Sequence, residues 1–558
     1  MEIPVPIKRF KLKIDEDDFD PINMNRDHME KKYLSVTKES AGRRNICLIN
    51  PRVENRSQNK AVQAIMNLTF PTSLGILSSY IMKFGMYNFD IIDEQIDVFD
   101  LESDDIKKYV DSMVAPKIVG FSVLTLNVGR ATEIAAKVKE ADPEVTVVFG
   151  GIHPTVADSD CLKHDCVDVC VRGEGERSFK LLCQHILAGE DYSHIDGLSV
   201  KVDGKVVQNP ATPLLKDLDQ VPAFPYFLFE KDKDLYPDFS ALFTSRGCPY
   251  KCTFCSSRDI TGLTYRFNSA ERTLEEIEIL VERYGQKSIH LMDDNIGVNK
   301  KQFFKLCQAI KDKGWAEKVA FEGSMRGDDA TYKVLRAAKE AGFRMVYYGL
   351  ETGSERLMKD LKKGETVQEI IDAIYRAKEV GIMVGTTIIF GLPDELHQDR
   401  LDCIKLLKNV PLDSVRYNTL APYPGTPLYN VFMPRGQVKV KGNWENFGVQ
   451  YMWESDDIPY VPETSDRLEL IHDTMTANLA AYISWEGIKN MIFSPTHGGN
   501  VIKLSEKWYT SFTDLWKLFN LGKFLILRYL SVKVRYWIRR LTGRLEGKPL
   551  VINERQVN

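Results

Sequence analysis

Residues 245–257 read S-R-G-C-P-Y-K-C-T-F-C-S-S, with cysteines at positions 248, 252 and 255. The C-x₃-C-x₂-C spacing of Cys248, Cys252 and Cys255 brings three thiols close enough to hold one metal centre. A cubic iron–sulfur cluster normally takes four cysteines. Three cysteines therefore leave one iron open to another ligand, and a cluster with an open iron is suited to chemistry as well as to electron storage.

Three kinds of metal centre compete for this loop. Structural zinc needs a fourth ligand nearby, and residues 240–268 contain no histidine and no fourth cysteine. A plain electron-transfer cluster lacks the same fourth thiolate. A cluster whose open iron binds a substrate or cofactor fits the residues best.

Length and composition set the broad class. The 558 residues predict two to four domains, and 44% hydrophobic with 27% charged residues is ordinary for a globular protein. A net charge of −4 argues against nucleic acid as a partner of the whole chain. Ten cysteines in 558 residues, of which three cluster and seven are scattered, indicate a reducing cytosol with one metal site rather than a disulfide scaffold. The polar N-terminus is no secretory signal, and no stretch reaches the roughly 18 apolar residues of a membrane span.

Between residues 45 and 189, short apolar strands alternate with helices. Continuous apolar strands separated by helices are typical of a parallel sheet covered on both faces, here a doubly wound domain. In that architecture, ligands bind at the carboxyl ends of the strands. The strands are expected at 45–50, 88–93, 117–125, 146–150 and 167–171, and the helices at 74–84, 104–113, 129–141 and 178–187.

The strand ends of this first block are small or polar. They comprise the segment 70–75, Ser122 and Thr125 after the third strand, the segment 150–155, and the segment 172–176. Glycines there let the backbone approach a ligand closely. Four such ends on one edge of a sheet indicate a large ligand.

A second alternating block runs from residue 238 to 425. Its six strand–helix units are fewer than the eight of a closed barrel, which predicts an open, partial barrel with its site at the carboxyl ends of the strands. The strands are expected at 239–244, 288–292, 319–322, 345–350, 384–390 and 415–420, and the helices at 274–284, 300–313, 330–341, 367–380 and 401–408.

The remaining segments are an arm, a connector, a cap and a tail. The connector contains a hairpin around Gly204 and is then rich in proline, and residues 430–500 read as a helical cap on the barrel. Residues 508–545 carry eight basic residues against one acidic residue, interleaved with large aromatic residues. Such a tail either lies in the headgroup region of an anionic membrane or packs as helices on the protein with a solvated basic face. The excess of one charge sign favours the membrane.

The cysteine loop, placed after the first strand of a partial six-unit barrel, resembles that of radical S-adenosylmethionine (SAM) enzymes. Phe254, an aromatic residue before the third cysteine, and the segment 422–427 match that family, and the resemblance covers about residues 237–427. It implies a [4Fe–4S] cluster on Cys248, Cys252 and Cys255. The open iron would bind SAM, whose reductive cleavage releases a 5′-deoxyadenosyl radical. The resemblance places SAM near Phe254, Asp293, Glu322, Arg326, Glu351, Thr352 and Gly391.

Together with this barrel, the first domain resembles the cobalamin-binding class of radical SAM enzymes. No histidine occurs between His28 and His153, so the cobalt-ligating histidine of the cobalamin-dependent mutases is missing, as is usual in this class. An alternative is that the domain keeps the fold and binds no corrin. Cys161, Cys166 and Cys170 are interpreted as core residues rather than as a second cluster. The cobalamin contacts are expected at Thr72, Ser73, Leu74, Gly75, Ser122, Thr125, Gly150, Gly151, His153, Glu174, Gly175 and Glu176.

The predicted fold is therefore α/β, with an N-terminal doubly wound, Rossmann-like cobalamin-binding domain, a partial (β/α)₆ radical SAM barrel and a largely helical C-terminal region. The predicted bounds are 1–44 for the arm, 45–194 for the cobalamin domain, 195–236 for the connector, 237–430 for the radical SAM core, 431–500 for the cap and 501–558 for the basic tail.

The predicted function is a cobalamin-dependent radical SAM methyltransferase acting on an unactivated carbon of a lipid, hopanoid or tetrapyrrole. The alternatives are a radical cyclase, desaturase or carbon–carbon coupling enzyme of the same architecture, and a non-catalytic cobalamin or redox sensor. The expected partners are a small-molecule or lipid substrate and a one-electron reductant such as flavodoxin or ferredoxin. The expected location is the cytoplasm, with membrane contact through the tail. The sequence singles out no catalytic proton donor or acceptor.

Overall fold

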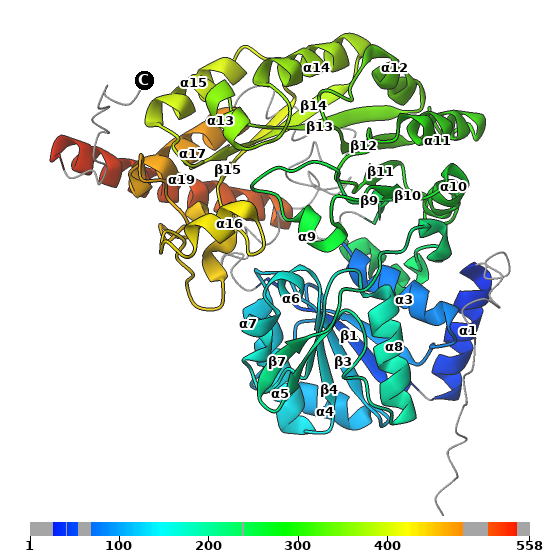
Figure 1. The fold of residues 1–558 in the computed structure, drawn as a ribbon. Coiled ribbons are helices and arrows are strands. Elements are labelled where there is room, and N and C mark those ends of the chain that lie inside the picture. Colours follow the sequence, from blue (N-terminus) through cyan, green and yellow to red (C-terminus); the bar gives the residue numbers. More distant parts are fainter. Residues whose placement is uncertain (1–25, 41, 54–68, 237–238, 484–511, 544–558) are drawn as a thin grey trace, which may run out of the picture.

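The computed structural model describes residues 26–40, 42–53, 69–236, 239–483 and 512–543, which fold into two stacked lobes (Figure 1). The lower lobe contains the first alternating block and the upper lobe contains the second. Helix α1 (Arg26–Glu39) packs on the lower lobe, where Met29 is buried and the Tyr33 hydroxyl donates to the Phe89 carbonyl at 3.2 Å. The rest of the predicted N-terminal arm, residues 1–25, lies outside the described residues.

The lower lobe is built on a seven-stranded sheet of order β2-β1-β3-β4-β5-β6-β7. Strands β1 to β5 are parallel, which confirms the predicted doubly wound core. The strands are β1 (Ile46–Asn50), β2 (Phe89–Asp93), β3 (Ile118–Ser122), β4 (Thr146–Gly150), β5 (Val169–Val171), β6 (Leu198–Val202) and β7 (Lys205–Gln208). The helices are α3 (Thr72–Lys83), α4 (Asp105–Ser112), α5 (Val128–Ala141), α6 (Ile152–Val156), α7 (Asp158–Leu162) and α8 (Gly175–Ala188).

Two features of this lobe differ from the sequence-based picture. The hairpin around Gly204, expected in the connector, extends the sheet because β6 pairs antiparallel with β5. The short helices α6 and α7 were not predicted, because five residues are too few to show a helical period. The domain bounds given above stay a prediction.

The upper lobe contains a six-stranded, all-parallel sheet of order β15-β14-β13-β12-β11-β8. An open sheet of six strands is what the count of six units predicted. The strands are β8 (Ala241–Leu242), β11 (Ser288–Leu291), β12 (Ala320–Ser324), β13 (Phe343–Glu351), β14 (Met383–Phe390) and β15 (Ser414–Thr419). The helices are α10 (Ala270–Glu278), continued by the π-turn η4 (Ile279–Arg283), α11 (Lys300–Asp312), α12 (Tyr332–Glu340), α13 (Glu355–Asp360), α14 (Val367–Val380) and α15 (His397–Leu407).

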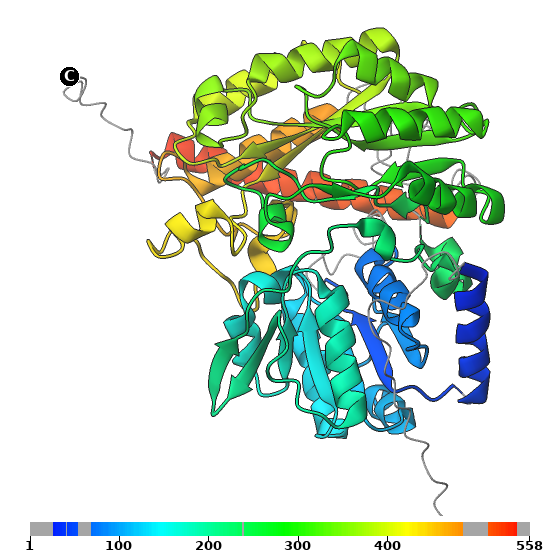
Figure 2. The ribbon, with the colours of Figure 1, turned by 45° about the vertical axis from the view of Figure 1, so that its right-hand side comes forward.

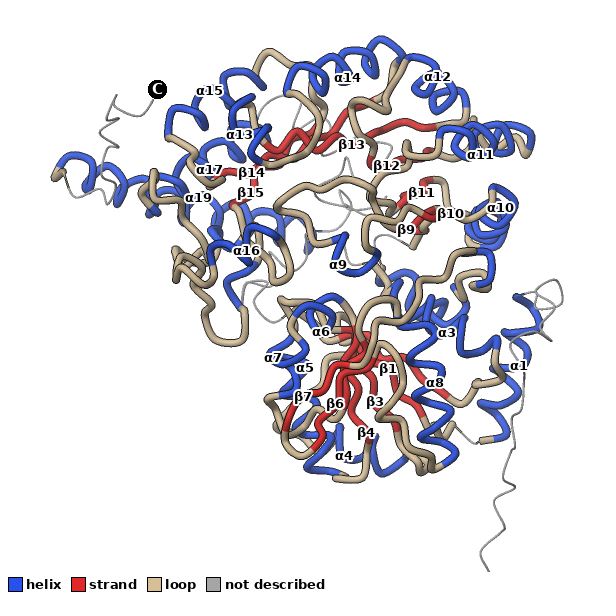
Figure 3. Tube along the Cα trace, in the orientation of Figure 1, coloured by secondary structure: helices blue, strands red, loops and turns tan. Residues whose placement is uncertain are grey.

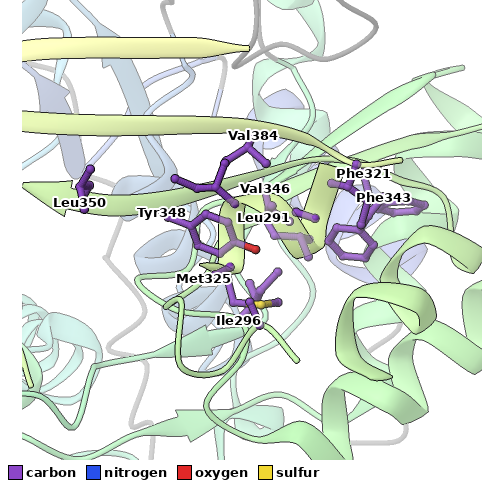
Figure 4. Close-up of a cluster of buried hydrophobic side chains, with 14 of the residues drawn as sticks. Leu291, Ile296, Phe321, Met325, Phe343, Val346, Tyr348, Leu350 and Val384 are labelled. Atoms are coloured by element: carbon purple, nitrogen blue, oxygen red, sulfur yellow. The ribbon is translucent and has the colours of Figure 1, made fainter. Parts of the chain in front are cut away.

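A continuous hydrophobic core joins this sheet to its helices. Alternate residues of each strand point to this face, because the side chains of a strand alternate between its two sides. Phe321, Phe343, Val346, Tyr348 and Val384 form its centre and are fully buried (Figure 4). The opposite alternation includes the polar or small residues Glu322, Gly349 and Thr387.

Smaller elements join the two lobes and cap the open barrel. The crossing segment contains the 3₁₀ turns η2 (Leu218–Gln220) and η3 (Tyr226–Leu235), and the cap contains α16 (Pro427–Phe432), η5 (Glu445–Phe447), η6 (Tyr451–Trp453) and α17 (Arg467–Ile483). Helix α17 packs on β15, where the Asn478 side chain both accepts from the Tyr417 N–H and donates to its carbonyl. This arrangement agrees with a helical cap on the barrel. Part of the cap, residues 484–500, lies outside the described residues.

The described part of the tail is one helix, α19 (Phe512–Leu541), which packs against α17 (Figure 2). Tyr536 stacks on His472 with ring centroids 4.3 Å apart, and Arg528 and Arg535 both pair with Asp456. Helical packing on the protein is therefore present in the tail. None of the helices in the described part of the chain has the length and apolar character that crossing a membrane requires.

Candidate active site between the two lobes

The cysteine loop is held at both ends by a short ribbon. Strand β9 (Ser245–Arg246) enters the loop and pairs antiparallel with β10 (Arg266–Phe267) beyond it. Between the two strands, helix α9 (Ser257–Thr261) follows Cys255. Gly247 turns the chain at φ +86°, and a Cβ atom there would lie 2.3 Å from the Thr264 carbonyl oxygen. Only glycine fits this turn, and the turn sets the position of Cys248, the first cysteine of the loop.

Asp293 fixes the chain just before the cysteine loop through several hydrogen bonds. This fully buried carboxylate accepts hydrogen bonds from the Thr244 N–H at 3.1 Å, from the Thr244 hydroxyl at 3.0 Å and from the Ser245 hydroxyl. Burial raises the pKa of Asp293 to about 6, and the same hydrogen bonds oppose that rise. These hydrogen bonds position β9 and hence the cysteines, and the expected contact of Asp293 with SAM stays a prediction.

The three thiols are half-buried, and burial raises the pKa of each. The pKa of Cys255 reaches about 12, whereas the positive charges of Lys363 and Arg326 act in the opposite direction on Cys248 and Cys252. A thiol that is costly to ionise gives up its proton when a metal takes the proton's place. The loop therefore suits a metal centre beside fixed positive charge.

The arrangement of the three sulfurs can be compared with the needs of a single zinc ion. One zinc ion holds sulfur ligands at about 2.3 Å each, which crowds them together. Among the described residues, the group of three with ligand atoms within 4.8 Å of one another is His397, Glu469 and Asp473, and the cysteine sulfurs do not form such a group. As they lie, the three sulfurs do not form the compact group that one zinc ion would need.

The His397 group is an ion-pair network rather than a metal site. Arg400, which is fully buried, donates to Asp473 at 2.8 Å and to Glu469 at 3.0 Å. His397 Nδ1 lies 2.8 Å from the same Asp473. The guanidinium already supplies the positive charge that a cation would bring.

At the ends of β12 and β13, charged side chains form a buried network near the loop. The Arg326 guanidinium lies 3.5 Å from the centroid of the Tyr250 ring and pairs with Asp328 at 2.9 Å. It also donates to the Lys363 carbonyl at 2.8 Å, and the Lys363 ammonium lies 3.5 Å from Glu351. The structure thus brings together Arg326 and Glu351, both predicted near SAM. The sequence reasoning missed Tyr250 and Lys363, although Tyr250 stands inside the cysteine motif.

Glu351 ends β13 in a strained backbone conformation. Its φ is +63°, a region that costs a non-glycine residue on the order of 1–3 kcal/mol. Its carboxylate folds back over Gly349, where a Cβ atom would meet Oε1 at 2.1 Å. Burial raises the pKa of Glu351, and Lys363 opposes that rise. Such strain is typical of a functional strand end.

The other residues predicted near SAM have varied surroundings. Thr352 follows Glu351 and is buried, and Gly391 follows β14 at φ +84° against Leu470 of α17. Glu322 lies within β12 rather than at its end, because the strand continues to Ser324, and Tyr347 donates to it at 3.4 Å. Phe254 packs on the hydrophobic core that the lower lobe shares with the cap. Their roles toward SAM stay a prediction.

A cavity of about 570 Å³ lies between the lobes, at the carboxyl ends of β3, β4 and β5. Figure 3 shows α9 between the two lobes, above the end of the lower sheet at which α6 lies. Cys255 and Ile260 line the cavity from above, and Leu124 lines it from below with 46% of its surface exposed. One cavity thus joins the cysteine loop to the edge of the lower sheet.

Most of the residues predicted to contact cobalamin line this cavity. They are Thr72, Ser73, Leu74, Ser122, Gly150, Gly151, Glu174, Gly175 and Glu176. The Ser73 and Ser122 hydroxyls lie 3.0 Å apart. Gly151 has φ +113°, and a Cβ atom there would lie 2.7 Å from the Val123 carbonyl oxygen. The missing side chain lets the turn after β4 pack directly on the Val123 backbone, which sets the position of this wall of the cavity.

Gly75, Thr125 and His153 do not line the cavity, and packing explains all three. A Cβ atom at Gly75 would lie 2.2 Å from the Phe224 ring. His153 is fully buried, with Nδ1 3.2 Å from the Thr125 hydroxyl and Nε2 3.3 Å from Asp160. Trp444 of the cap donates to the same Asp160 at 2.9 Å. His153 therefore belongs to a contact between the lower lobe and the cap.

Two arginines tie the ribbon around the cysteine loop to the lower lobe. Both terminal nitrogens of Arg266 donate to the Glu174 carboxylate, at 2.8 and 2.5 Å. Arg246 pairs with Glu176 at 2.6 Å. All four side chains are largely buried. Glu174 and Glu176 line the cavity while their charges are paired with arginines of the upper lobe, and their contact with cobalamin stays a prediction. They fix the cysteine loop over the cavity.

Cys161, Cys166 and Cys170 pack in the core of the lower lobe, as expected. Cys161 and Cys170 are fully buried, and Cys166 packs at the edge of the same core. All ten cysteines of the chain are free of disulfides.

Comparisons with known proteins give the same division into lobes. Residues 67–182 match the model of the B12 binding domain, and residues 242–407 match that of the radical SAM superfamily. The chain is 34% identical over 407 residues to an uncharacterised methyltransferase, PH0819, of Pyrococcus horikoshii, covering 72% of this chain and 86% of that protein. It is 27% identical to the anaerobic magnesium-protoporphyrin IX monomethyl ester cyclase of Rubrivivax gelatinosus, covering 64% of this chain and 65% of the cyclase.

Among solved structures, the cobalamin-dependent SAM radical enzyme OxsB, with aqua-cobalamin and SAM bound, superimposes with a TM-score of 0.62. The match covers 92% of this chain and 82% of OxsB at 18% identity, which establishes a shared fold. This chain belongs to the cobalamin-binding radical SAM enzyme family. The cofactors of that family are a [4Fe–4S] cluster, SAM and cobalamin, and its methyltransferases include relatives of this chain.

Proposed function

We propose that this enzyme transfers a methyl group to an unactivated carbon of an apolar substrate such as a lipid, a hopanoid or a tetrapyrrole. One observation carries the proposal: Cys255 of the cluster loop and the glycine-rich strand ends of the B12-binding lobe line the same cavity. An unactivated carbon has no lone pair with which to attack a methyl donor. A radical source and a methyl source in one cavity meet that need.

The residues of each wall suit the group that they would hold. Cys248, Cys252 and Cys255 would bind the cluster, beside the positive charges of Arg326 and Lys363. The wall formed by Gly150, Gly151 and Gly175 would receive the corrin ring. When bound, cluster-activated SAM supplies a radical that removes hydrogen from carbon, and methylated cobalamin supplies the methyl group.

This chain's own residues set the distance between the two walls. Glu174 and Glu176 hold the ribbon above the cavity through Arg266 and Arg246. The side chains of Leu124, Ile260 and Phe179 give the cavity an apolar lining. Such a lining is compatible with radical chemistry. We further propose a cytoplasmic enzyme that receives single electrons from flavodoxin or ferredoxin.

The test is turnover with SAM labelled in the methyl group. Protein reconstituted anaerobically with iron, sulfide and cobalamin would be reduced and incubated with lipid and tetrapyrrole extracts. We expect 5′-deoxyadenosine and a labelled product that is one carbon heavier. Formation of 5′-deoxyadenosine with a product of unchanged carbon count would replace methyl transfer by cyclisation or desaturation.

The second candidate, a radical cyclase, has a specific observation in its favour. The similarity to the Rubrivivax cyclase extends over 381 residues, which is 64% of this chain. The distinction lies in the fate of the label: a cyclase would leave the labelled methyl group on SAM or on methionine. Recovery of 5′-deoxyadenosine without label in any product would favour it.

A further inference from the structure

From Ile526 to Leu541, the side of α19 that faces away from the protein is apolar. Seven large apolar side chains there are 46–81% exposed: Ile526, Leu527, Leu530, Val534, Trp537, Ile538 and Leu541. Their spacing of three and four residues places them along one side of a helix. We call this set the outer stripe.

The opposite side of the same helix already packs on the protein. Val532 and Tyr536 are buried, Tyr536 stacks on His472, and Arg528 and Arg535 bind Asp456. A surface helix normally turns polar residues outward once one side is buried. Because α19 is apolar on both sides, the outer stripe is not needed for packing of the helix on α17.

Charge narrows the choice of partner. Residues 520–543 contain six basic residues and no aspartate or glutamate. Arg528 and Arg535 are engaged with Asp456, and Arg539 lies 3.9 Å from Asp466. Among the described residues, Lys523, Lys533 and Arg540 pair with no carboxylate; Lys533 lies 5.5 Å from the Tyr529 ring, and Arg540 lies 5.4 Å from the Trp537 ring and donates to the Tyr536 hydroxyl at 3.2 Å. A second copy of this helix would bring like charges together. The surface is complementary to an anionic partner with an apolar interior.

We propose that α19 docks this protein on an anionic phospholipid membrane. The helix lies parallel to the surface, with the outer stripe at the boundary of the acyl chains and Lys523, Lys533 and Arg540 on the headgroups. From Ile526 to Leu541, the stripe is about 24 Å long at 1.5 Å per residue. Figure 1 shows the C-terminal end of α19 at the edge of the described chain.

This docking surface is separate from the cavity between the lobes, so the inference stands whether the reaction is methyl transfer or cyclisation. The residues of the outer stripe do not line the cavity. Membrane docking would present an apolar substrate to the enzyme without its passage through water.

Vesicle sedimentation of the reconstituted full-length protein tests the docking. We expect at least about tenfold more protein to pellet with phosphatidylglycerol-containing vesicles than with pure phosphatidylcholine vesicles, and less at high salt. The variant Leu530→Gln/Val534→Gln/Trp537→Gln should lose this binding. Lys523→Gln/Lys533→Gln/Arg540→Gln should reduce it toward the level seen with neutral vesicles.

A matched control replaces three exposed apolar residues of the lower lobe. Leu187, Val202 and Val207 are 38–43% exposed, and their triple glutamine variant should bind vesicles like the unaltered protein. Unchanged circular dichroism and cluster absorbance would show that each variant is folded. No vesicle binding, equal binding to neutral vesicles, or undiminished binding by the stripe variant would overturn the proposal. A protein dimer that the stripe variant abolishes, without vesicle binding, would assign the stripe to a second copy instead.

Discussion

The cysteine loop and the edge of the lower sheet face each other across one cavity, yet they are built in opposite ways. The loop is held by paired charges and satisfied polar groups: Asp293 before it, and Arg246 and Arg266 on its ribbon. The sheet edge is shaped by missing side chains, as at Gly150 and Gly151. A radical source needs fixed geometry, whereas a broad planar ligand needs space.

This difference predicts different kinds of failure. Loss of a polar group at the loop leaves a buried partner unpaired, which is costly. Addition of a side chain at the sheet edge fills space and strains the backbone. The four predictions below address the two sides of the cavity in order of expected effect.

The largest effect is expected at the cluster ligands. Cys252→Ala should abolish cluster binding, because two remaining thiolates cannot hold a cluster that normally takes three or four. Iron content and visible absorbance after anaerobic reconstitution measure this. Cys166→Ala, which removes a cysteine from the core of the lower lobe, should keep the cluster. A normal iron content in Cys252→Ala would refute the assignment of the loop.

The next effect concerns the link between the lobes. Glu174→Gln removes the partner of Arg266 and should destabilise the protein by about 3–5 kcal/mol, because the buried guanidinium loses its counter-charge. Denaturant unfolding measures the stability, and limited proteolysis of the connector reports on loosening of the lobes. Glu140→Gln, which breaks an exposed pair with Lys137, serves as the control and should change neither. If both variants lost the same amount of stability, the Glu174–Arg266 pair would contribute no more than an exposed ion pair.

The clamp at Asp293 predicts a pH dependence. Because burial raises its pKa in the folded state to about 6 from 3.8, the folded protein binds the proton more tightly than the unfolded chain does. The stabilisation by that proton is fully present below about pH 4 and is lost as pH rises through 6, on the order of 3 kcal/mol in total. Asp293→Asn should remove this part of the pH profile.

Unfolding free energies of the unaltered protein and of Asp293→Asn across pH 4 to 7 check the prediction, since other groups titrate alike in both. The difference between the two proteins should change with pH over this range. A constant difference would mean that Asp293 is ionised throughout and that its hydrogen bonds outweigh its burial.

The smallest effect is expected at the sheet edge. Gly151→Ala should cost about 2 kcal/mol and weaken cobalamin binding, because Gly151 has a positive φ and its Cβ atom would press on the Val123 backbone. Gly189→Ala separates the two causes: Gly189 also has a positive φ, +70°, but nothing lies within 4 Å of its Cβ position. Cobalamin titration followed by visible absorbance should show a defect at position 151 and none at 189. Equal binding by both variants would remove Gly151 from the proposed corrin wall.

Much of this molecule could be predicted from local signals. The spacing of Cys248, Cys252 and Cys255 and the runs of apolar residues were enough to predict both sheets and the partial barrel, because hydrophobic periodicity acts over a few residues. The glycine-rich strand ends predicted a large ligand, and a cavity lies there. The domain bounds and the individual SAM and cobalamin contacts stay predictions.

The partners across the cavity could not be predicted in this way. Glu174 and Arg266 are 92 residues apart in the chain, and Asp160 and Trp444 are 284 apart. A single sequence shows which residues carry charge, but the choice among many possible partners depends on how the lobes dock. The chain's local chemistry therefore specifies a cluster loop and a glycine-lined sheet edge. Only the packing of the two lobes makes them the walls of one cavity, because the contacts that join them connect residues distant in the sequence.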